Sequence, residues 1–221
     1  MAKWKAWPKD QDGIRGRIKI GAPETLTIYR LGPILREYRQ SYPAVDIILC
    51  NDFNAPLYEK LKRGEIDIAI QIGTDDQNQE YVAIDLAYES LVLIANNDCG
   101  IDNLESGPEQ LANESVIYNA KGCIYRTVFE EYLKSRQIVP CNTIELWSIE
   151  GIKQAVVNGL GISVLPFITV KEDLEGGRLK ALDLELHANK IPLQLVYQKN
   201  KWLSKSILAW IELTQKHVGN W

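Results

Sequence analysis

The 221-residue sequence predicts an α/β fold that is divided into two lobes. Segments with the pattern of β-strands alternate along the chain with segments that have the period of amphipathic helices. The predicted strands are too many for one compact lobe, and they separate into two groups near residues 86–90. The stretch IEGIKQAVVNGLGISVLP at 149–166 adds a complete α/β unit, because a helix, a left-handed cap at Asn158-Gly159 and a short strand follow one another before Pro166.

The first group of elements follows a polar stretch at residues 1–13, which we interpret as a tail or a linker remnant. A helix is predicted at 26–40, and Tyr42-Pro43 ends it because the residue before a proline avoids the helical region. Its apolar stripe comprises Ile28, Leu31, Ile34, Leu35 and Tyr38. The other predicted elements are strands at 17–21, 45–50 and 66–72 and a short helix around Leu57 and Leu61.

The second group continues the alternation to the end of the chain. Strands are predicted at 89–95, 115–119, 143–147, 161–165 and 191–198. Helices are predicted at 107–111, 126–136, from 149, at 167–174 and at 204–217. This order indicates a mostly parallel sheet covered by helices. In such sheets ligands bind beyond the carboxyl ends of the strands.

Composition argues against several classes of protein. Hydrophobic residues make up 46% and charged residues 24% of the chain, as in ordinary globular proteins. A net charge of −4 does not favour nucleic-acid binding by this chain itself, because phosphate binding needs clustered Lys and Arg. Neither a signal peptide nor a membrane span is apparent, so we expect a cytoplasmic protein with no membrane partner. The four cysteines, Cys50, Cys99, Cys123 and Cys141, form no CxxC pair and suit a reducing compartment.

No pattern in the sequence requires catalysis, a metal or a cofactor. His187 and His217 are the only histidines, and neither follows a predicted strand, so a Ser or Cys nucleophile has no evident base. Phosphate-binding and zinc-binding motifs are absent. Gly159-Leu-Gly161 follows a helix instead of a strand, which is typical of a C-cap and not of a dinucleotide site. We therefore expect no enzyme activity, no catalytic residue, no metal site and no cofactor.

Five motifs in order resemble the effector-binding domain of LysR-type transcriptional regulators. They are GRIKIGAPET (16–25), REYRQSYPAVDIIL (36–49), KRGEIDIAI (62–70), SIEGIKQAVVNGLGISVLP (148–166) and DLEGGRLKAL (173–182). The resemblance covers residues 14 to about 217. It implies a type 2 periplasmic-binding-protein-like fold, in which two Rossmann-like lobes are joined by two crossing strands. By this resemblance lobe I takes residues 14–87 plus 192–221, and lobe II takes 88–191.

The resemblance also implies partners. A small effector would bind between the lobes, and the domain would form a homodimer, or a tetramer in a full-length protein, through the helices at 26–40 and 126–136. DNA would be bound only through an N-terminal helix-turn-helix domain that this chain lacks. Three alternatives remain at this stage, namely a solute-binding protein of a transporter, a thiol-based redox regulator and an enzyme on the same scaffold.

The effector site is expected at the turns 23–26, 51–54 and 119–126, at Ser148 and at Pro166-Phe167. The predicted effector-binding residues are Glu24, Thr25, Leu26, Asn51, Phe53, Lys121, Gly122, Cys123, Arg126, Ser148, Pro166 and Phe167. A small carboxylate is the first expectation, because hydroxyl and backbone N–H groups could bind it together with Arg126 or Lys121. A carboxylate at Glu24 would repel an anion, so an amine-bearing or neutral ligand is the alternative. Ser148 and Thr25 could instead only cap helices, Arg126 could pair with Glu130, and Cys123 could be a packing residue.

Overall fold

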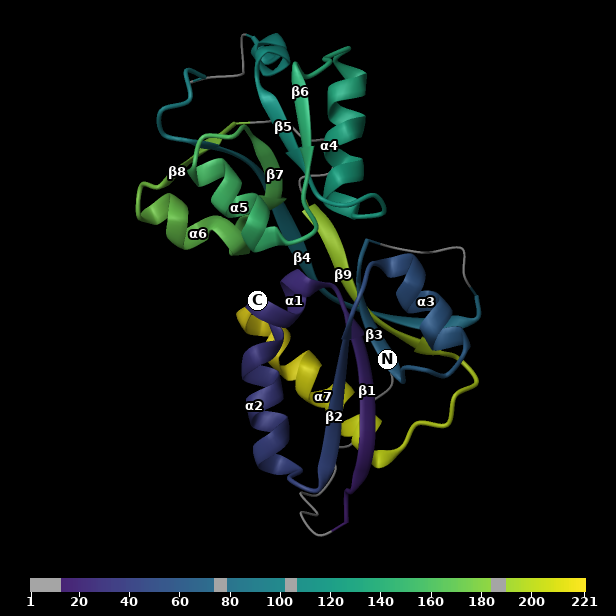
Figure 1. Cartoon of the computed structure of the whole chain (residues 1–221). Helices are drawn as coiled ribbons and strands as arrows, with labels where there is room; N and C mark the ends of the chain where they lie inside the picture. The colour runs from purple at the N-terminus through teal and green to yellow at the C-terminus, as the bar shows by residue number, and fades with distance from the viewer. Residues whose placement is uncertain (1–12, 74–78, 102–106, 184–189) are drawn as a thin grey trace.

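The structure is a computed structural model, and it describes residues 13–73, 79–101, 107–183 and 190–221. Two groups of elements lie one above the other and are joined by two long strands, β4 (Tyr81–Asn96) and β9 (Lys190–Gln198) (Figure 1). Nearly all of the predicted tail at 1–13, and His187, lie outside the described residues. Among the helices that are described, none has the length and apolar character needed to cross a bilayer.

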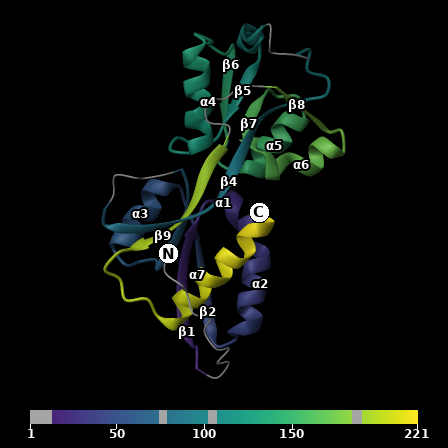
Figure 2. The same ribbon diagram turned by 180° about the vertical axis from the view of Figure 1, so that it is seen from behind.

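The lower group of elements in Figure 1 is lobe I. Its elements are β1 (Gly16–Ala22), α1 (Glu24–Tyr29), α2 (Leu31–Ser41), β2 (Val45–Asn51), α3 (Asn54–Lys62), β3 (Ile68–Ile72), α7 (Lys205–His217) and a closing 3-10 turn (Val218–Asn220). Helix α7 crosses the back of this lobe in Figure 1 and its front in Figure 2. Trp210 of α7 is fully buried and packs edge-on against Tyr38 of α2, with ring centroids 5.3 Å apart. The C-terminal helix therefore completes the hydrophobic core of the lobe that the N-terminal elements form.

Lobe II is the upper group in Figure 1. Its elements are a 3-10 helix (Pro108–Asn113), β5 (Ser115–Tyr118), α4 (Ile124–Ser135), β6 (Asn142–Glu145), α5 (Ile149–Val157), β7 (Ser163–Pro166), α6 (Phe167–Glu175) and β8 (Leu179–Leu182). Helix α5 buries Ile149, Ile152 and Val156 on one stripe, as the sequence predicted. Asn158 is its C-cap and Gly159 has a φ of +74°, the left-handed conformation that glycine adopts without steric cost.

The sheet is less parallel than the sequence predicted. Strand β1 lies between β2 and β3 and is parallel to both, and β5 is parallel to β6. Strand β9, however, is antiparallel to β3 and to β4, and β4 is antiparallel to β7 and β8. The prediction of a mostly parallel sheet is therefore wrong wherever the two long strands take part. Alternation of helices and strands does not determine the direction of a strand that returns from the other lobe.

Strand β4 is also longer than predicted, because it begins at Tyr81 and not at Glu89. It pairs with β9 from Tyr81–Gln198 to Ser90–Lys190, and the register shifts once, between Asp85 and Ala87. This shift lies where the chain passes from lobe I toward lobe II. Such a bulge increases the local twist of a strand pair.

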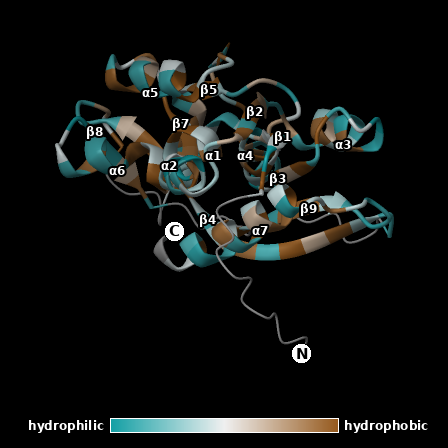
Figure 3. Ribbon diagram, turned by 90° about the horizontal axis from the view of Figure 1, so that it is seen from below, coloured by the Kyte–Doolittle hydropathy of each residue, from teal (hydrophilic) through white to brown (hydrophobic). Residues whose placement is uncertain are grey.

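The helix predicted at 26–40 is divided in two at Arg30, which ends α1 and precedes α2. Leu31, Ile34 and Tyr38 are buried as predicted, whereas Ile28 is 50% exposed, so its place on the apolar stripe was wrong. Figure 3, coloured by hydropathy, shows helices such as α2, α5 and α6 with both polar and apolar residues, as expected for helices that cover a sheet on one side.

Candidate functional site

A cavity of about 430 Å³ lies where the turns of the two lobes face each other. Lobe I contributes Pro23, Glu24, Thr25, Asn51, Asp52, Phe53, Asn54 and Ile72. Lobe II contributes Asn119, Gly122, Cys123, Ile124, Tyr125, Trp147, Ser148 and Ile149. Its size is within the range of small-molecule sites, and most of the larger side chains around it are apolar or aromatic.

The positions of these residues follow from strand ends. Strand β1 ends at Ala22 and β2 at Asn51, immediately before or at cavity residues of lobe I. In lobe II, β5 ends at Tyr118 just before Asn119, and β6 ends at Glu145 two residues before Trp147. In an open α/β sheet this is the edge at which ligands bind, because the turns after neighbouring parallel strands meet there.

Thr25 and Tyr125 join the lobes by a hydrogen bond between their hydroxyl groups, whose oxygen atoms are 3.0 Å apart. Both side chains are buried. Burial raises the pKa of Tyr125 well above its ordinary value, and the hydrogen bond with Thr25 opposes this only in part. Tyr125 is therefore a neutral phenol that can donate or accept one hydrogen bond at the cavity wall.

Glu24 reaches from lobe I to the first turn of α5 in lobe II. Its Oε2 accepts a hydrogen bond from the backbone N–H of Ile149 at 3.4 Å. Ser148 is the N-cap of the same helix, and its Oγ accepts from the backbone N–H of Gly151 at 3.5 Å. The expectation that Ser148 caps a helix is confirmed, and the residue also lines the cavity.

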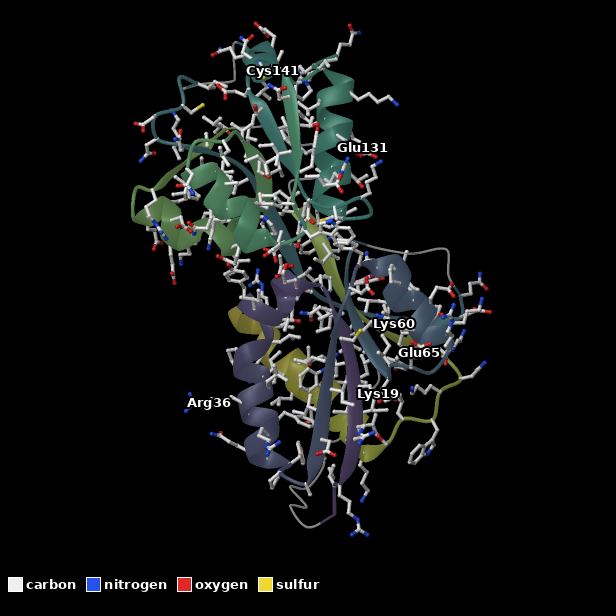
Figure 4. The ribbon with its side chains drawn as sticks, in the orientation of Figure 1. Lys19, Arg36, Lys60, Glu65, Glu131 and Cys141 are labelled. Carbon is white, nitrogen blue, oxygen red and sulfur yellow. The ribbon has the colours of Figure 1, made fainter. Side chains whose placement is uncertain are left out.

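The second turn of lobe I is held by its own hydrogen bonds. Lys60 of α3, labelled in Figure 4, donates to Asp52 Oδ2 at 2.8 Å and to Cys50 Sγ at 3.1 Å. The bonds to Asp52 and Cys50 raise the pKa of Lys60, so this ammonium stays charged. Asn54 donates to the backbone carbonyl of Ile72 at 2.6 Å and accepts from its N–H at 3.3 Å. Asp52 and Asn54 thus stiffen the wall and have little capacity left for a ligand.

Asn51 and Asn119 retain free amide groups. Asn51 Oδ1 accepts from Thr27 Oγ1 at 2.9 Å, and Asn119 Oδ1 accepts from the backbone N–H of Ala120 at 2.7 Å. Neither Nδ2 group donates a hydrogen bond within the described ranges, although Asn119 is only 6% exposed. Both residues line the cavity, so a ligand acceptor there could take a hydrogen bond from either amide group.

At the rim, α1 is connected to α5 and α6 by a network of charged groups. The Tyr29 hydroxyl donates to Glu150, and Lys153 Nζ lies 2.9 Å from Glu150 and 3.3 Å from Asp173. Burial, followed by the bond to Glu150, raises the pKa of Tyr29 to about 12. These contacts hold the lobes together beside the cavity without lining it.

Seven of the twelve predicted site residues line the cavity and five do not. The lining residues are Glu24, Thr25, Asn51, Phe53, Gly122, Cys123 and Ser148. Leu26 instead lies in the core of lobe I, Lys121 is exposed, Pro166 pairs with Leu91 in the sheet and Phe167 begins α6 with 44% of its surface exposed.

Arg126 also lies away from the lining. Its guanidinium is 2.7 Å from Glu130 and 2.6 Å from Glu145, and it donates to the carbonyl of Asn119 at 3.0 Å. It also stacks over the Tyr118 ring, 4.9 Å from the centroid. The pairing with Glu130 that the sequence offered as an alternative is confirmed. Arg126 therefore supports the Asn119 turn from behind, and its charge is already paired.

The cysteines divide by environment. Cys123 lines the cavity, and burial raises the pKa of its thiol, which disfavours the reactive thiolate. Cys141 is exposed at the end of lobe II that is remote from lobe I (Figure 4). Among the described residues, no three His, Cys, Asp or Glu side chains come together as a metal site would require.

Ile72, Trp147 and Ile149 line the cavity although no prediction named them. Ile72 ends strand β3, and Trp147 directly precedes the cap of α5. A rule that includes the last residue of each strand and the residues on either side of each helix cap would have found all three.

Comparisons with known proteins agree with this architecture. A family model described as the LysR substrate binding domain matches residues 11–219. The HTH-type transcriptional regulator YwqM of Bacillus subtilis is 36% identical over 203 residues, which are 91% of this chain and 69% of that protein.

Solved structures share the fold at lower identity. The regulatory domain of CcmR from Synechocystis, in complex with 2-PG, has a TM-score of 0.80 at 23% identity, with 93% of this chain and 99% of that one covered. The effector binding domain of QuiR in complex with shikimate has a TM-score of 0.77 at 16% identity, with coverages of 94% and 99%. These likenesses concern the fold, and they confirm the predicted type 2 periplasmic-binding-protein-like class. With the match of the family model over almost the whole chain, they show that this chain belongs to the family of LysR substrate binding domains.

Proposed function

We propose that this chain is the effector-sensing domain of a LysR-type transcriptional regulator and that the inter-lobe cavity holds the effector. The observation that carries the proposal is the construction of the cavity, which draws its lining from the strand ends of both lobes. A ligand there touches lobe I and lobe II at once. It would stabilise the arrangement of the lobes to which it binds more tightly. The size of this effect is set by the difference between its affinities for that arrangement and for the alternative one.

Two similar folds support the proposal that the ligand is a small molecule. The CcmR and QuiR domains are described in complex with 2-PG and with shikimate, so the same architecture holds small molecules in those proteins. The carboxylate expected from the sequence depended on Arg126 or Lys121, and neither lines this cavity. The proposal therefore names the site and not yet the chemical class of its ligand.

The proposal includes partners beyond the effector. Since YwqM is named as an HTH-type regulator and this chain matches 69% of its length, we assign DNA binding to a helix-turn-helix domain outside the chain. We assign dimer contacts to the faces of α2 and α4, the helices that the sequence resemblance suggested. We retain the lobe boundaries, 14–87 plus 192–221 for lobe I and 88–191 for lobe II, as part of the same proposal.

Binding without turnover is also proposed. Within the described part of the chain, the cavity lining contains no histidine, and its one cysteine is held as a thiol. Asp52 is paired with Lys60, and Glu24, the other carboxylate of the lining, accepts from the backbone N–H of Ile149 at the first turn of α5. These features favour a sensor over the enzyme and the thiol-based regulator considered from the sequence.

A metabolite screen by thermal shift, followed by calorimetry, tests the proposal. A ligand that binds only the native state raises the midpoint of unfolding by an amount that depends on its concentration. The informative variant is Asn51→Trp, which places a large ring at an exposed position on the cavity wall. Asp46→Trp, at an exposed position toward the other end of strand β2, is the matched control.

We expect hits that bind the wild type and Asp46→Trp equally and bind Asn51→Trp at least about tenfold more weakly, which corresponds to about 1.4 kcal/mol. Hits that bind Asn51→Trp as tightly as the wild type would place the ligand elsewhere and overturn the assignment.

A further inference from the structure

The cavity wall carries one carboxylate, Glu24, that no described cation pairs. Glu24 and Asp52 are its two formally charged residues, and the lining contains no Lys or Arg within the described part of the chain. Asp52 is neutralised by Lys60 at 2.8 Å. Glu24 forms no ion pair with any described residue, and its one hydrogen bond comes from the N–H of Ile149 at 3.4 Å.

The nearby cations cannot supply what Glu24 lacks. Arg126 is paired with Glu130 and Glu145, and Lys153 is paired with Glu150 and Asp173. Lys121 is exposed and is not part of the lining. A cation that approaches Glu24 from inside the cavity must therefore come with the ligand.

The other walls specify the rest of the ligand. Phe53 and Ile72 of lobe I face Trp147 and Tyr125 of lobe II around the same space, which suits an apolar or aromatic body. Asn119 is only 6% exposed, and its Nδ2 group has no hydrogen-bond acceptor among the described residues. That amide is a second, independent sign of a ligand, and it calls for an oxygen acceptor on that ligand.

We infer that the effector is a small organic amine, in which an ammonium group pairs with Glu24, an apolar body fills the aromatic walls and a carbonyl or hydroxyl oxygen accepts from Asn119. This inference rests on the proposed function, because it uses the same cavity. It disfavours an anionic effector, since an anion in this cavity would meet an unpaired carboxylate and no positive side chain among the described lining residues.

The contact between Glu24 and Ile149 could by itself give Glu24 a purely structural role as a cap of α5. A carboxylate, however, offers about four acceptor positions, and one long hydrogen bond uses only one of them. A capping role predicts that Glu24→Gln lowers stability without changing the preference for ligand charge. A binding role predicts that the preference itself changes.

The test compounds form matched sets on two bodies. L-Phenylalaninamide and L-leucinamide are cations with a carbonyl acceptor, their N-acetyl derivatives are neutral, and N-acetyl-L-phenylalanine and N-acetyl-L-leucine are anions. Calorimetry measures each with the wild type, with Glu24→Gln and with Glu65→Gln. Glu65 is an exposed glutamate of lobe I away from the cavity, labelled in Figure 4.

We expect at least one cation to bind about tenfold or more tightly than the neutral and anionic compounds of its set. Glu24→Gln should reduce that cation's affinity by about ten- to a hundredfold, and Glu65→Gln should leave it unchanged. Circular dichroism and the midpoint of unfolding of the free variants check that Glu24→Gln is folded.

Tighter binding of the anions, an undiminished preference for the cation in Glu24→Gln, or binding of none of the six compounds would overturn the inference. These results leave the proposed function standing if the metabolite screen still yields a ligand that Asn51→Trp excludes. If that screen yields none, the proposed function fails together with the inference.

Discussion

Arg30 and Glu89 form a buried ion pair at the junction of the lobes, with Nη2 of the arginine 3.2 Å from Oε1 and 3.3 Å from Oε2 of the glutamate. Arg30 is 8% and Glu89 1% exposed. Arg30 separates α1 from α2, and Glu89 lies in β4 where that strand passes between the lobes. The guanidinium also lies over the ring of Trp221, 5.6 Å from its centroid, so the last residue of the chain covers the pair.

Removal of one member of this pair should destabilise the protein strongly. Arg30→Met leaves the Glu89 carboxylate buried without a counterion, and we expect a loss of about 3–5 kcal/mol in the free energy of unfolding, measured with urea. The double variant Arg30→Met/Glu89→Leu should recover most of this loss, because neither charge remains. A single variant that loses less than about 1 kcal/mol would contradict the description of the pair as buried and mutually dependent.

The same glutamate predicts a dependence of stability on pH. Burial raises the pKa of Glu89, and Arg30 offsets this only in part. The folded protein therefore retains the proton to a higher pH than the unfolded chain does. The contribution of Glu89 to stability is greatest below the unfolded pKa, about 4.3, and decreases as the pH rises through the folded value.

Unfolding free energies of the wild type and Glu89→Gln, measured from about pH 4 to pH 7, check this expectation. The wild type minus variant difference should become more favourable to the wild type as the pH falls. Arg30 stays charged throughout and adds no slope. A difference that changes in the opposite direction would show that the ion pair, and not burial, dominates the titration of Glu89.

The hydroxyl pair between the lobes should show measurable coupling. Tyr125→Phe leaves the buried Thr25 hydroxyl without its partner, and we expect a loss of about 1–3 kcal/mol in the free energy of unfolding. Thr25→Val removes the other half. The double variant should lose less than the sum of the two single losses, by about 0.5 kcal/mol or more, and strict additivity would indicate that the two groups do not interact.

Gly161 should be among the least replaceable residues of the chain. Its φ is +150°, and a methyl group added there would lie 2.1 Å from the carbonyl oxygen of Ser115. That carbonyl accepts from the N–H of Ile162, so it cannot move without breaking the contact between β5 and the strand that follows α5. We expect Gly161→Ala to cost about 2–5 kcal/mol, from backbone strain and overpacking together.

Gly151 is the matched control for this substitution. It is exposed in the first turn of α5, where an added methyl group would make only an ordinary contact of 3.7 Å with Cβ of Ser148. Gly151→Ala should therefore be neutral or stabilising by up to about 1 kcal/mol, because alanine has the higher helix propensity. Equal effects of the two substitutions in thermal unfolding would show that the tight approach at Gly161 is not a real constraint.

The features that were predictable from the sequence are local ones. The cap of α5 at Ser148, the glycine cap at Gly159 and the polar turns after β1, β2 and β5 all follow from patterns of a few residues. The direction of β4 and β9 does not, because it depends on pairing between segments about a hundred residues apart. The break between α1 and α2 at Arg30 was not predictable for a similar reason. The buried Arg30 side chain is paired with Glu89, which is 59 positions away in the sequence.

The residues of the candidate site also divide into those predictable from local sequence and those that depend on the tertiary fold. The turns that face the cavity were found because they follow strands, and Asn119 and Tyr125 lie within one of them. Arg126 does not reach the cavity because its charge is paired with two glutamates. Glu130 lies four residues away on the same helix, and Glu145 lies in the next strand along the chain. A charged residue at a turn predicts ligand binding only after its protein partners are known, and those partners come largely from the tertiary fold.

The place of β9 and α7 in lobe I has a consequence for how the polypeptide is made. Strand β9 pairs with β3, and Trp210 of α7 packs against Tyr38, yet both elements leave the ribosome after the whole of lobe II. Lobe II is continuous between β4 and β9 and can acquire its structure during synthesis. Lobe I cannot complete its sheet and core until β9 and α7 have also been synthesised.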